Sequence, residues 1–143
     1  MKIKKLDALL SLSRSIKLAS GRYDRIYQPS VMEIIELSKI ELSIMARGFN
    51  INEKEALFLS ASCIYVLEEW DTSEFRVGDL CSTLGIDNIE ILLYLKYFRM
   101  LVEKGFWIEI PKENLPSPYD FKSAFEVLNY EFVLNTSLGE HLV

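Results

Sequence analysis

Apolar residues recur at intervals of three and four positions through most of the first hundred residues. This spacing places them on one face of a helix. It predicts helices over residues 4–19, 31–47 and 53–70. We expect Gly21 and Gly48 to end the first two, because glycine readily adopts the left-handed conformation found after helix C-termini.

Two of these helices begin with the signature of a capping box. Ser30 stands three residues before Glu33, and Asn52 stands three before Glu55. At this spacing each side chain can bond a backbone N–H group that the first helical turn leaves without a partner. The helix after Asn52 is strongly apolar along residues 56–67, so we expect it to lie at the centre of the domain.

The next segment predicts a helix–turn–helix followed by a strand. Residues 75–77 favour a short strand, residues 79–84 a helix, and Gly85 a tight turn. A helix over 88–104, opened by a capping box, and a strand over 106–110 complete the pattern. The capping box would join Asp87 to Glu90. The apolar positions that define the helix–turn–helix are Leu80, Leu84, Ile86, Ile89, Leu92 or Leu93, Leu95 and Phe98.

The final third predicts a small β-hairpin. Alternation over 106–110 places Phe106, Ile108 and Ile110 on one face and Trp107 on the other. Trp107 then either packs under the hairpin, which is the more common environment of tryptophan, or is exposed as an anchor for a partner. A returning strand over 130–135 would pair with it, after a proline-rich loop. Residues 119–129 fit either a short helix or an extension of the hairpin. A further helical pattern starts at Thr136 and stops at Val143, so we expect the natural polypeptide to continue.

Together these elements predict a mainly α (α+β) fold, a winged helix-turn-helix with two extra N-terminal helices and a small β-hairpin wing. We expect residues 1–50 to form a helical extension and residues 51–143 the winged-helix domain. The chain has 143 residues, of which 50% are hydrophobic, enough for a sizeable core. No apolar run reaches the ~18 residues that cross a bilayer, and no signal-peptide core follows Met1, so we expect a cytoplasmic protein. Cys63 and Cys81 lie in apolar helical patterns and should be buried, reduced thiols.

The charge is distributed unevenly along the chain. Residues 1–28 hold seven Lys/Arg against two Asp/Glu, a net of +5, whereas residues 29–143 hold nine against nineteen, a net of −10. The larger, acidic part would repel a polyanion. The basic end could attract one, but docking on an acidic neighbour, in the same chain or another, is the interpretation we favour.

The expected recognition helix is poorly suited to DNA. Its first turn carries Asp87 and Glu90, where a DNA reader would present cations or amides to the groove. Its basic residues, Lys96 and Arg99, lie farther along. An alternative remains a winged-helix transcription regulator, in which Lys96, Arg99 and the basic N-terminal segment contact phosphates, with a dimer doubling those contacts.

The sequence contains no recognisable set of catalytic residues. The single histidine, His141, lies two residues from the end, and the chain lacks nucleotide-binding glycine loops and Cys/His clusters. We therefore expect no catalytic residue, cofactor or metal, and expect the function to be contact with a protein partner or a neighbouring subunit. The candidate interaction residues are two cations and two large aromatic residues: Lys96, Arg99, Trp107 and Trp70.

Three segments resemble the N-terminal region of certain bacterial AAA-family ATPases. They are residues 37–46 (LSKIELSIMA), residues 49–59 (FNINEKEALFL) and the helix–turn–helix that begins at Phe75. In that family such a winged-helix region precedes a ring-forming motor. The resemblance implies a non-catalytic accessory domain that mediates protein–protein interaction. It transfers no functional residue, because the ATP-binding motifs of the family are absent from this sequence.

Overall fold

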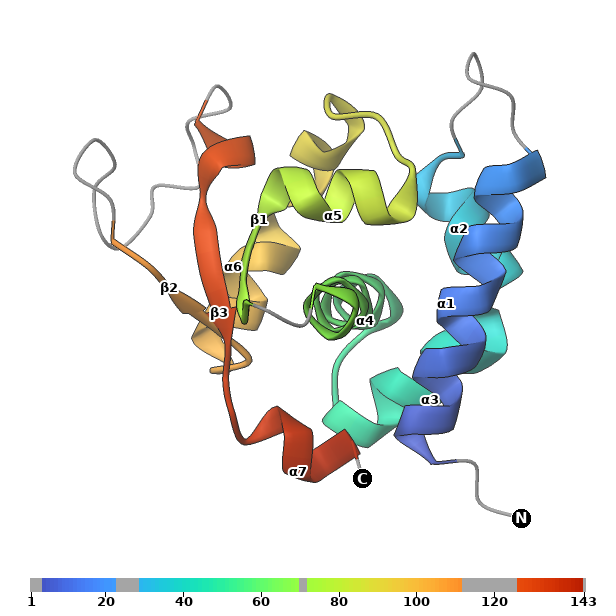
Figure 1. Cartoon of the computed structure of the whole chain (residues 1–143), viewed down its shortest axis with the longest axis horizontal. Helices are drawn as coiled ribbons and strands as arrows, with labels where there is room; N and C mark the ends of the chain where they lie inside the picture. The colour runs from blue at the N-terminus through green and yellow to red at the C-terminus, as the bar shows by residue number, and fades with distance from the viewer. Residues whose placement is uncertain (1–3, 23–28, 70–71, 112–125, 143) are drawn as a thin grey trace.

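Helices make up most of the protein, and a small three-stranded antiparallel sheet covers one side of them (Figure 1). The computed structural model describes residues 4–22, 29–69, 72–111 and 126–142. The elements, in chain order, are α1 (Lys5–Arg22), α2 (Val31–Leu37), α3 (Lys39–Phe49), α4 (Glu53–Glu68), β1 (Glu74–Arg76), α5 (Val77–Leu84), the 3₁₀ segment η1 (Glu90–Tyr94), α6 (Leu95–Glu103), β2 (Trp107–Glu109), the 3₁₀ segment η2 (Val127–Asn129), β3 (Glu131–Leu134) and α7 (Leu138–Leu142).

Helix α4 lies at the centre, as its sequence predicts. Every residue from Glu55 to Ile64 is buried, and Figure 1 looks along this helix with the other elements arranged around it. Asn52 begins the helix by accepting a hydrogen bond from the Glu55 backbone N–H at 2.8 Å, which confirms the predicted cap. The helix ends at Glu68, two residues earlier than predicted.

The predicted helix over 31–47 is two helices, α2 and α3. Ser30 caps α2 as expected, because its Oγ accepts from the Glu33 N–H at 3.1 Å. The chain then kinks at Ser38, which lies between the two helices with φ −118° and ψ 25°. The kink lets the apolar stripes of both helices reach the core, since Val31 and Leu42 are each fully buried.

The prediction that Gly48 ends this region was wrong, since α3 continues to Phe49. The following residue, Asn50, takes the left-handed conformation, with φ 55°. Gly48 instead allows a close approach of α1, because a Cβ atom at this position would lie 2.3 Å from Cε of Lys5. Helix α1 likewise runs through Gly21 and ends at Arg22.

The three strands are ordered β1-β3-β2, with β3 antiparallel to both neighbours. The predicted pairing of the returning strand is confirmed, with Ile108 opposite Val133. Packing of Trp107, the alternative that the sequence favours, is confirmed, so the inner face of β2 is that of Trp107 and not that of Ile108. Trp107 is 1% exposed and Ile108 is 48% exposed.

Trp107 takes the inner position because its large ring fills the space between the sheet and the helices. Its centroid lies 5.0 Å from that of Phe75, 5.6 Å from Phe98 and 5.1 Å from Phe132. Its indole N–H donates to Ser62 Oγ of α4 at 3.1 Å, so its single polar group is satisfied. An isoleucine would bury less apolar area there and could not make this bond.

The segment predicted as a helix–turn–helix contains helix α5, a turn and helix α6, with η1 between the turn and α6. Gly85 has φ 70° at the turn after α5, and Ile86 is buried, both as predicted. The single helix expected over 88–104 was wrong, because 3₁₀ turns of η1 precede α6. The capping box was also wrong. Asp87 accepts from the Ile89 N–H at 2.7 Å, whereas Glu90 accepts from the Val31 N–H of α2 at 2.9 Å.

The core is continuous across the expected domain boundary. One cluster of buried side chains joins Leu12 of α1 and Met45 of α3 to Leu57 of α4 and Phe132 of the sheet. Helix α7 also meets the start of α1, where Lys5 Nζ donates to the His141 carbonyl at 3.0 Å. The division into residues 1–50 and 51–143 stays a prediction about folding units.

Replacing Trp107 with alanine should therefore destabilise the protein strongly. We expect Trp107→Ala to lower the free energy of unfolding by about 3–5 kcal/mol, because it leaves a cavity among three aromatic rings and removes the bond to Ser62. Ile108→Ala, on the same strand and half exposed, should cost less than about 1 kcal/mol. Urea unfolding of both variants measures the difference, and equal losses would contradict the assignment of the strand's inner face.

Candidate functional site

The structure separates the four residues that the sequence suggests for interaction. Lys96 and Arg99 are exposed on α6, whereas Trp107 is buried and cannot anchor a partner. Trp70 lies outside the described residues. The ammonium of Lys96 lies 5.1 Å from the ring centroid of Tyr97, a cation–π distance. The exposed candidates therefore belong to one element, the helix after the turn.

The same region exposes apolar side chains that the sequence pattern assigns to the core. Ile89 is 76% exposed and Leu93 is 73% exposed, while Ile91 and Tyr94 are buried in their place. Met100, seven residues after Leu93, is also exposed. These residues, with Lys96, define what we call the η1–α6 face. Exposed side chains of this size in one place are characteristic of contact surfaces.

A shallow hollow of ≈ 370 Å³ adjoins this face between α2, the start of α4 and α6. Met32 and Tyr97 supply its apolar surface, and Lys54 borders it. The Lys54 ammonium lies 5.4 Å from the Tyr97 ring centroid and donates to the Tyr97 hydroxyl at 3.3 Å. The hollow thus offers apolar side chains and Lys54, and Lys96 lies close to the same aromatic ring, that of Tyr97.

The acidic side chains near the turn are already engaged with backbone groups. Asp87 and Glu90 accept from the N–H groups of Ile89 and Val31, as described above. A phosphate approaching the first turn would meet these two carboxylates and the apolar side chain of Ile89. This arrangement is unfavourable for a polyanion, because phosphate binding depends on cations and free N–H groups.

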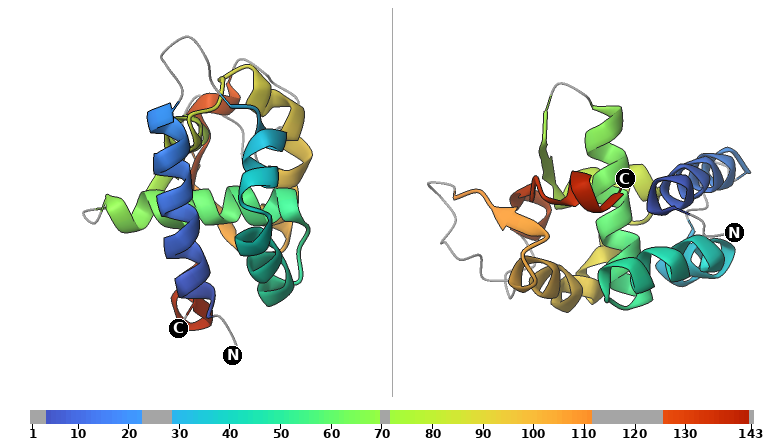
Figure 2. Two further views of the ribbon diagram at one scale, coloured as in Figure 1. Left: turned by 90° about the vertical axis from the view of Figure 1, so that its right-hand side faces the viewer. Right: turned by 90° about the horizontal axis from the view of Figure 1, so that it is seen from below.

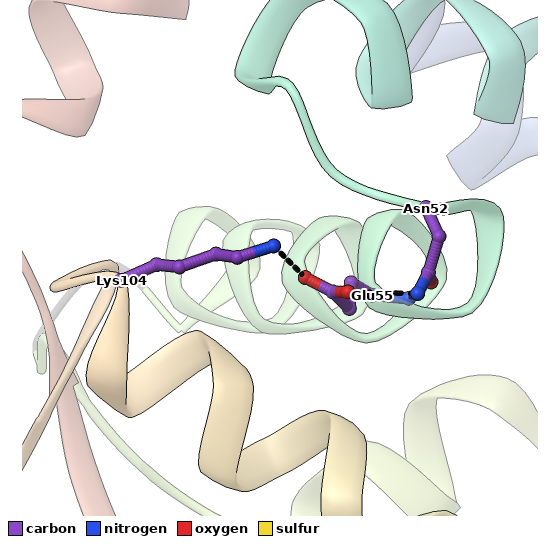
Figure 3. Close-up of polar contacts among 3 residues, drawn as sticks. All are labelled: Asn52, Glu55 and Lys104. Atoms are coloured by element: carbon purple, nitrogen blue, oxygen red, sulfur yellow. Dashed lines mark hydrogen bonds and ion pairs between the residues drawn. The ribbon is translucent and has the colours of Figure 1, made fainter.

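A buried charged cluster lies at the start of α4 and is the strongest candidate for ionisable chemistry (Figure 3). Glu55 accepts from Lys104 Nζ at 2.8 Å and from Asn52 Nδ2 at 2.7 Å. Both carboxylate oxygens therefore have a partner, and the Glu55 side chain is only 5% exposed. The cluster fastens the end of α6 to the start of α4, which is a structural role.

The two thiols are poorly suited to nucleophilic chemistry. Burial raises the pKa of Cys63 to about 12 and that of Cys81 to about 11, so both are protonated at neutral pH. The thiolate is the reactive form of cysteine. Both cysteines are free, as predicted. Among the described residues, no three His, Cys, Asp or Glu side chains gather in a way that could hold a metal ion.

The chain matches no protein-family model, no curated protein and no solved structure. Across the described part of the chain, no helix has the length and apolar character needed to cross a membrane.

Loss of the Lys104 ammonium should destabilise the fold, because the Glu55 carboxylate would remain buried with one fewer partner. We expect Lys104→Met to lower the free energy of unfolding by about 1–3 kcal/mol. Lys17→Met is the matched control, since the Lys17–Glu68 pair is exposed on both sides and should contribute less than about 1 kcal/mol. Chemical denaturation at pH 7 compares the two, and a loss at Lys104 no larger than at Lys17 would contradict the structural role.

Proposed function

We propose that this chain is a winged-helix accessory domain that binds a protein partner through the η1–α6 face. The order of elements supports the winged-helix assignment. Helix α4, strand β1, helix α5, a glycine turn, the η1–α6 segment and the β2/β3 pair follow one another as in that motif. In addition, β1 joins the β2/β3 pair along β3, so the strand before the helix–turn–helix belongs to the same sheet.

The exposure of Ile89 and Leu93 is the main support for the proposed contact with a protein. These side chains occupy the end of the recognition segment nearest the turn, where a DNA-binding relative would place groups that read bases. Two aliphatic residues, each about three-quarters exposed, offer nothing to a phosphate but can be buried against a protein. Lys96 and Lys54 would then lie at the polar rim of the contact.

We further propose that the domain belongs to the N-terminal part of an AAA-type ATPase. The support is the sequence resemblance over residues 37–59 and the segment from Phe75. In this setting the domain would hold a partner or a neighbouring subunit and contribute no chemistry of its own. A reading frame that continues past codon 143 into a Gly-x-x-x-x-Gly-Lys-Ser/Thr loop would support this placement, and a continuation without such a loop would count against it.

Site-directed photo-crosslinking tests the η1–α6 face. A benzophenone amino acid at position 93 should yield a discrete adduct with a single protein in an extract of the source cells, because Leu93 would be buried in the contact. Unlabelled wild-type chain should compete for the adduct, whereas the Ile89→Asp variant should compete at least about tenfold less well. Position 108, half exposed on β2, is the control site and should give no such adduct.

DNA binding is the outcome that would overturn this proposal. The chain should bind random duplex DNA more weakly than micromolar in a gel-shift titration at low salt, because the first turn of the segment presents carboxylates and aliphatic groups. Micromolar binding with a steep salt dependence, reduced by Lys96→Ala and Arg99→Ala, would favour the transcription-regulator alternative instead.

A further inference from the structure

A second apolar surface lies on the opposite side of α4 from the sheet. The C-terminal end of α4 extends past α1 where the two helices cross (Figure 2, left), and a hollow of ≈ 380 Å³ lies at that crossing. We call it the α1–α4 corner and define it by six of its lining residues. They are Leu6, Leu10, Ser13 and Lys17 of α1 with Leu67 and Glu68 of α4.

Three leucines give the corner its apolar character. Leu6 is 44% exposed, Leu10 is 51% exposed and Leu67 is 61% exposed, and all three line the same hollow. Leucines scattered singly over a surface need no explanation, but a convergent group from two helices indicates a contact site. The concave shape fits a helix better than it fits a flat lipid surface.

The spacing of the α1 residues is that of a helix-pairing seam. Positions 6, 10, 13 and 17 are separated by four, three and four residues, the interval at which side chains meet a second helix in a coiled coil. At 1.5 Å per residue the seam is about 17 Å long, roughly three turns. Leu6 and Leu10 form the apolar half of the seam, and a seam of this length suits one additional helix.

The charges beside the seam are complementary to those of a second, antiparallel copy of the same helix. Asp7 and Arg14 are two turns apart on the same flank of the seam, with Leu10 between them, and both are exposed. Neither forms an ion pair with another residue in the described part of the chain. A two-fold axis near Leu10 would place Asp7 of each copy opposite Arg14 of the other.

We propose that the α1–α4 corner is the contact between two copies of this chain, with their α1 helices antiparallel. Leu10 lies near the two-fold axis, and Leu6 packs against the C-terminal half of the seam on the second copy. Two Asp7–Arg14 pairs determine the antiparallel orientation of the helices. Leu67 covers the second helix from the side. Lys17 keeps its partner Glu68, at 2.6 Å, so its charge adds little repulsion across the contact. This inference does not depend on the function proposed for the η1–α6 face.

Sedimentation equilibrium of the isolated chain tests the proposal. The wild type should show a concentration-dependent monomer–dimer equilibrium with a Kd in the micromolar range, as expected for a short seam. Leu10→Asp should weaken dimerisation at least about a hundredfold, because the buried carboxylate occurs twice at the axis. Ile40→Asp is the matched control, since Ile40 is 72% exposed on α3, outside the corner, and should leave the equilibrium unchanged.

A charge exchange tests the antiparallel arrangement independently of any effect of Leu10→Asp on folding. Asp7→Arg and Arg14→Asp should each weaken dimerisation about three- to tenfold, because each places like charges together at two symmetric points. The double variant with both exchanges should recover wild-type affinity. Circular dichroism checks that all variants remain helical. A chain that stays monomeric up to millimolar concentration, a dimer that tolerates Leu10→Asp, or single exchanges that the double variant does not rescue would each overturn the proposal.

Discussion

The fold depends on covering α4 from every direction. A helix that is apolar around its whole circumference is stable only when other elements exclude water from all its faces. Residues 55–64 are buried without a break, and α1, α3, α5, α6 and the sheet supply the cover. The one charged side chain in this stretch, Glu55, lies at the start of the helix, where Asn52 and Lys104 can reach it. The central helix thus determines both the arrangement of layers and the position of the buried ion pair.

Features that depend on a few neighbouring residues could be predicted from the sequence. The caps at Ser30 and Asn52 and the left-handed turn at Gly85 formed as expected, because each requires only a local backbone conformation and one or two side chains. The pairing of β3 with β2 was also predictable, since alternation and the intervening loop define a hairpin. Strand β1 joins β3 over a long separation in sequence, and no local signal identifies that pairing.

The errors arise where a distant partner decides between two local possibilities. Glu90 could bond its own helix start, but the first N–H of α2 is within reach and takes its carboxylate instead. The sequence leaves the environment of Trp107 open for the same reason: Trp107 and Ile108 are both suitable for the inner face of β2, and the aromatic pocket with Ser62 selects the tryptophan. The exposed face of η1 and α6 was missed for a related reason. Ile89, Ile91 and Leu93 are equally apolar, so the pattern alone could not show which of them faces the core once 3₁₀ turns shift the register.

The charge distribution takes on a different meaning once the elements are placed. The basic segment, residues 1–28, contains α1. Its charges near the α1–α4 corner are a mixture of Asp7, Arg14 and the paired Lys17, so the net charge of +5 does not form a uniform cationic face there. The η1–α6 segment lies on another side of α4 (Figure 1). Because α4 separates the two surfaces, a contact at one would leave the other open. The two proposed contacts are therefore compatible, since a second copy at the α1–α4 corner leaves the η1–α6 face accessible to a different protein.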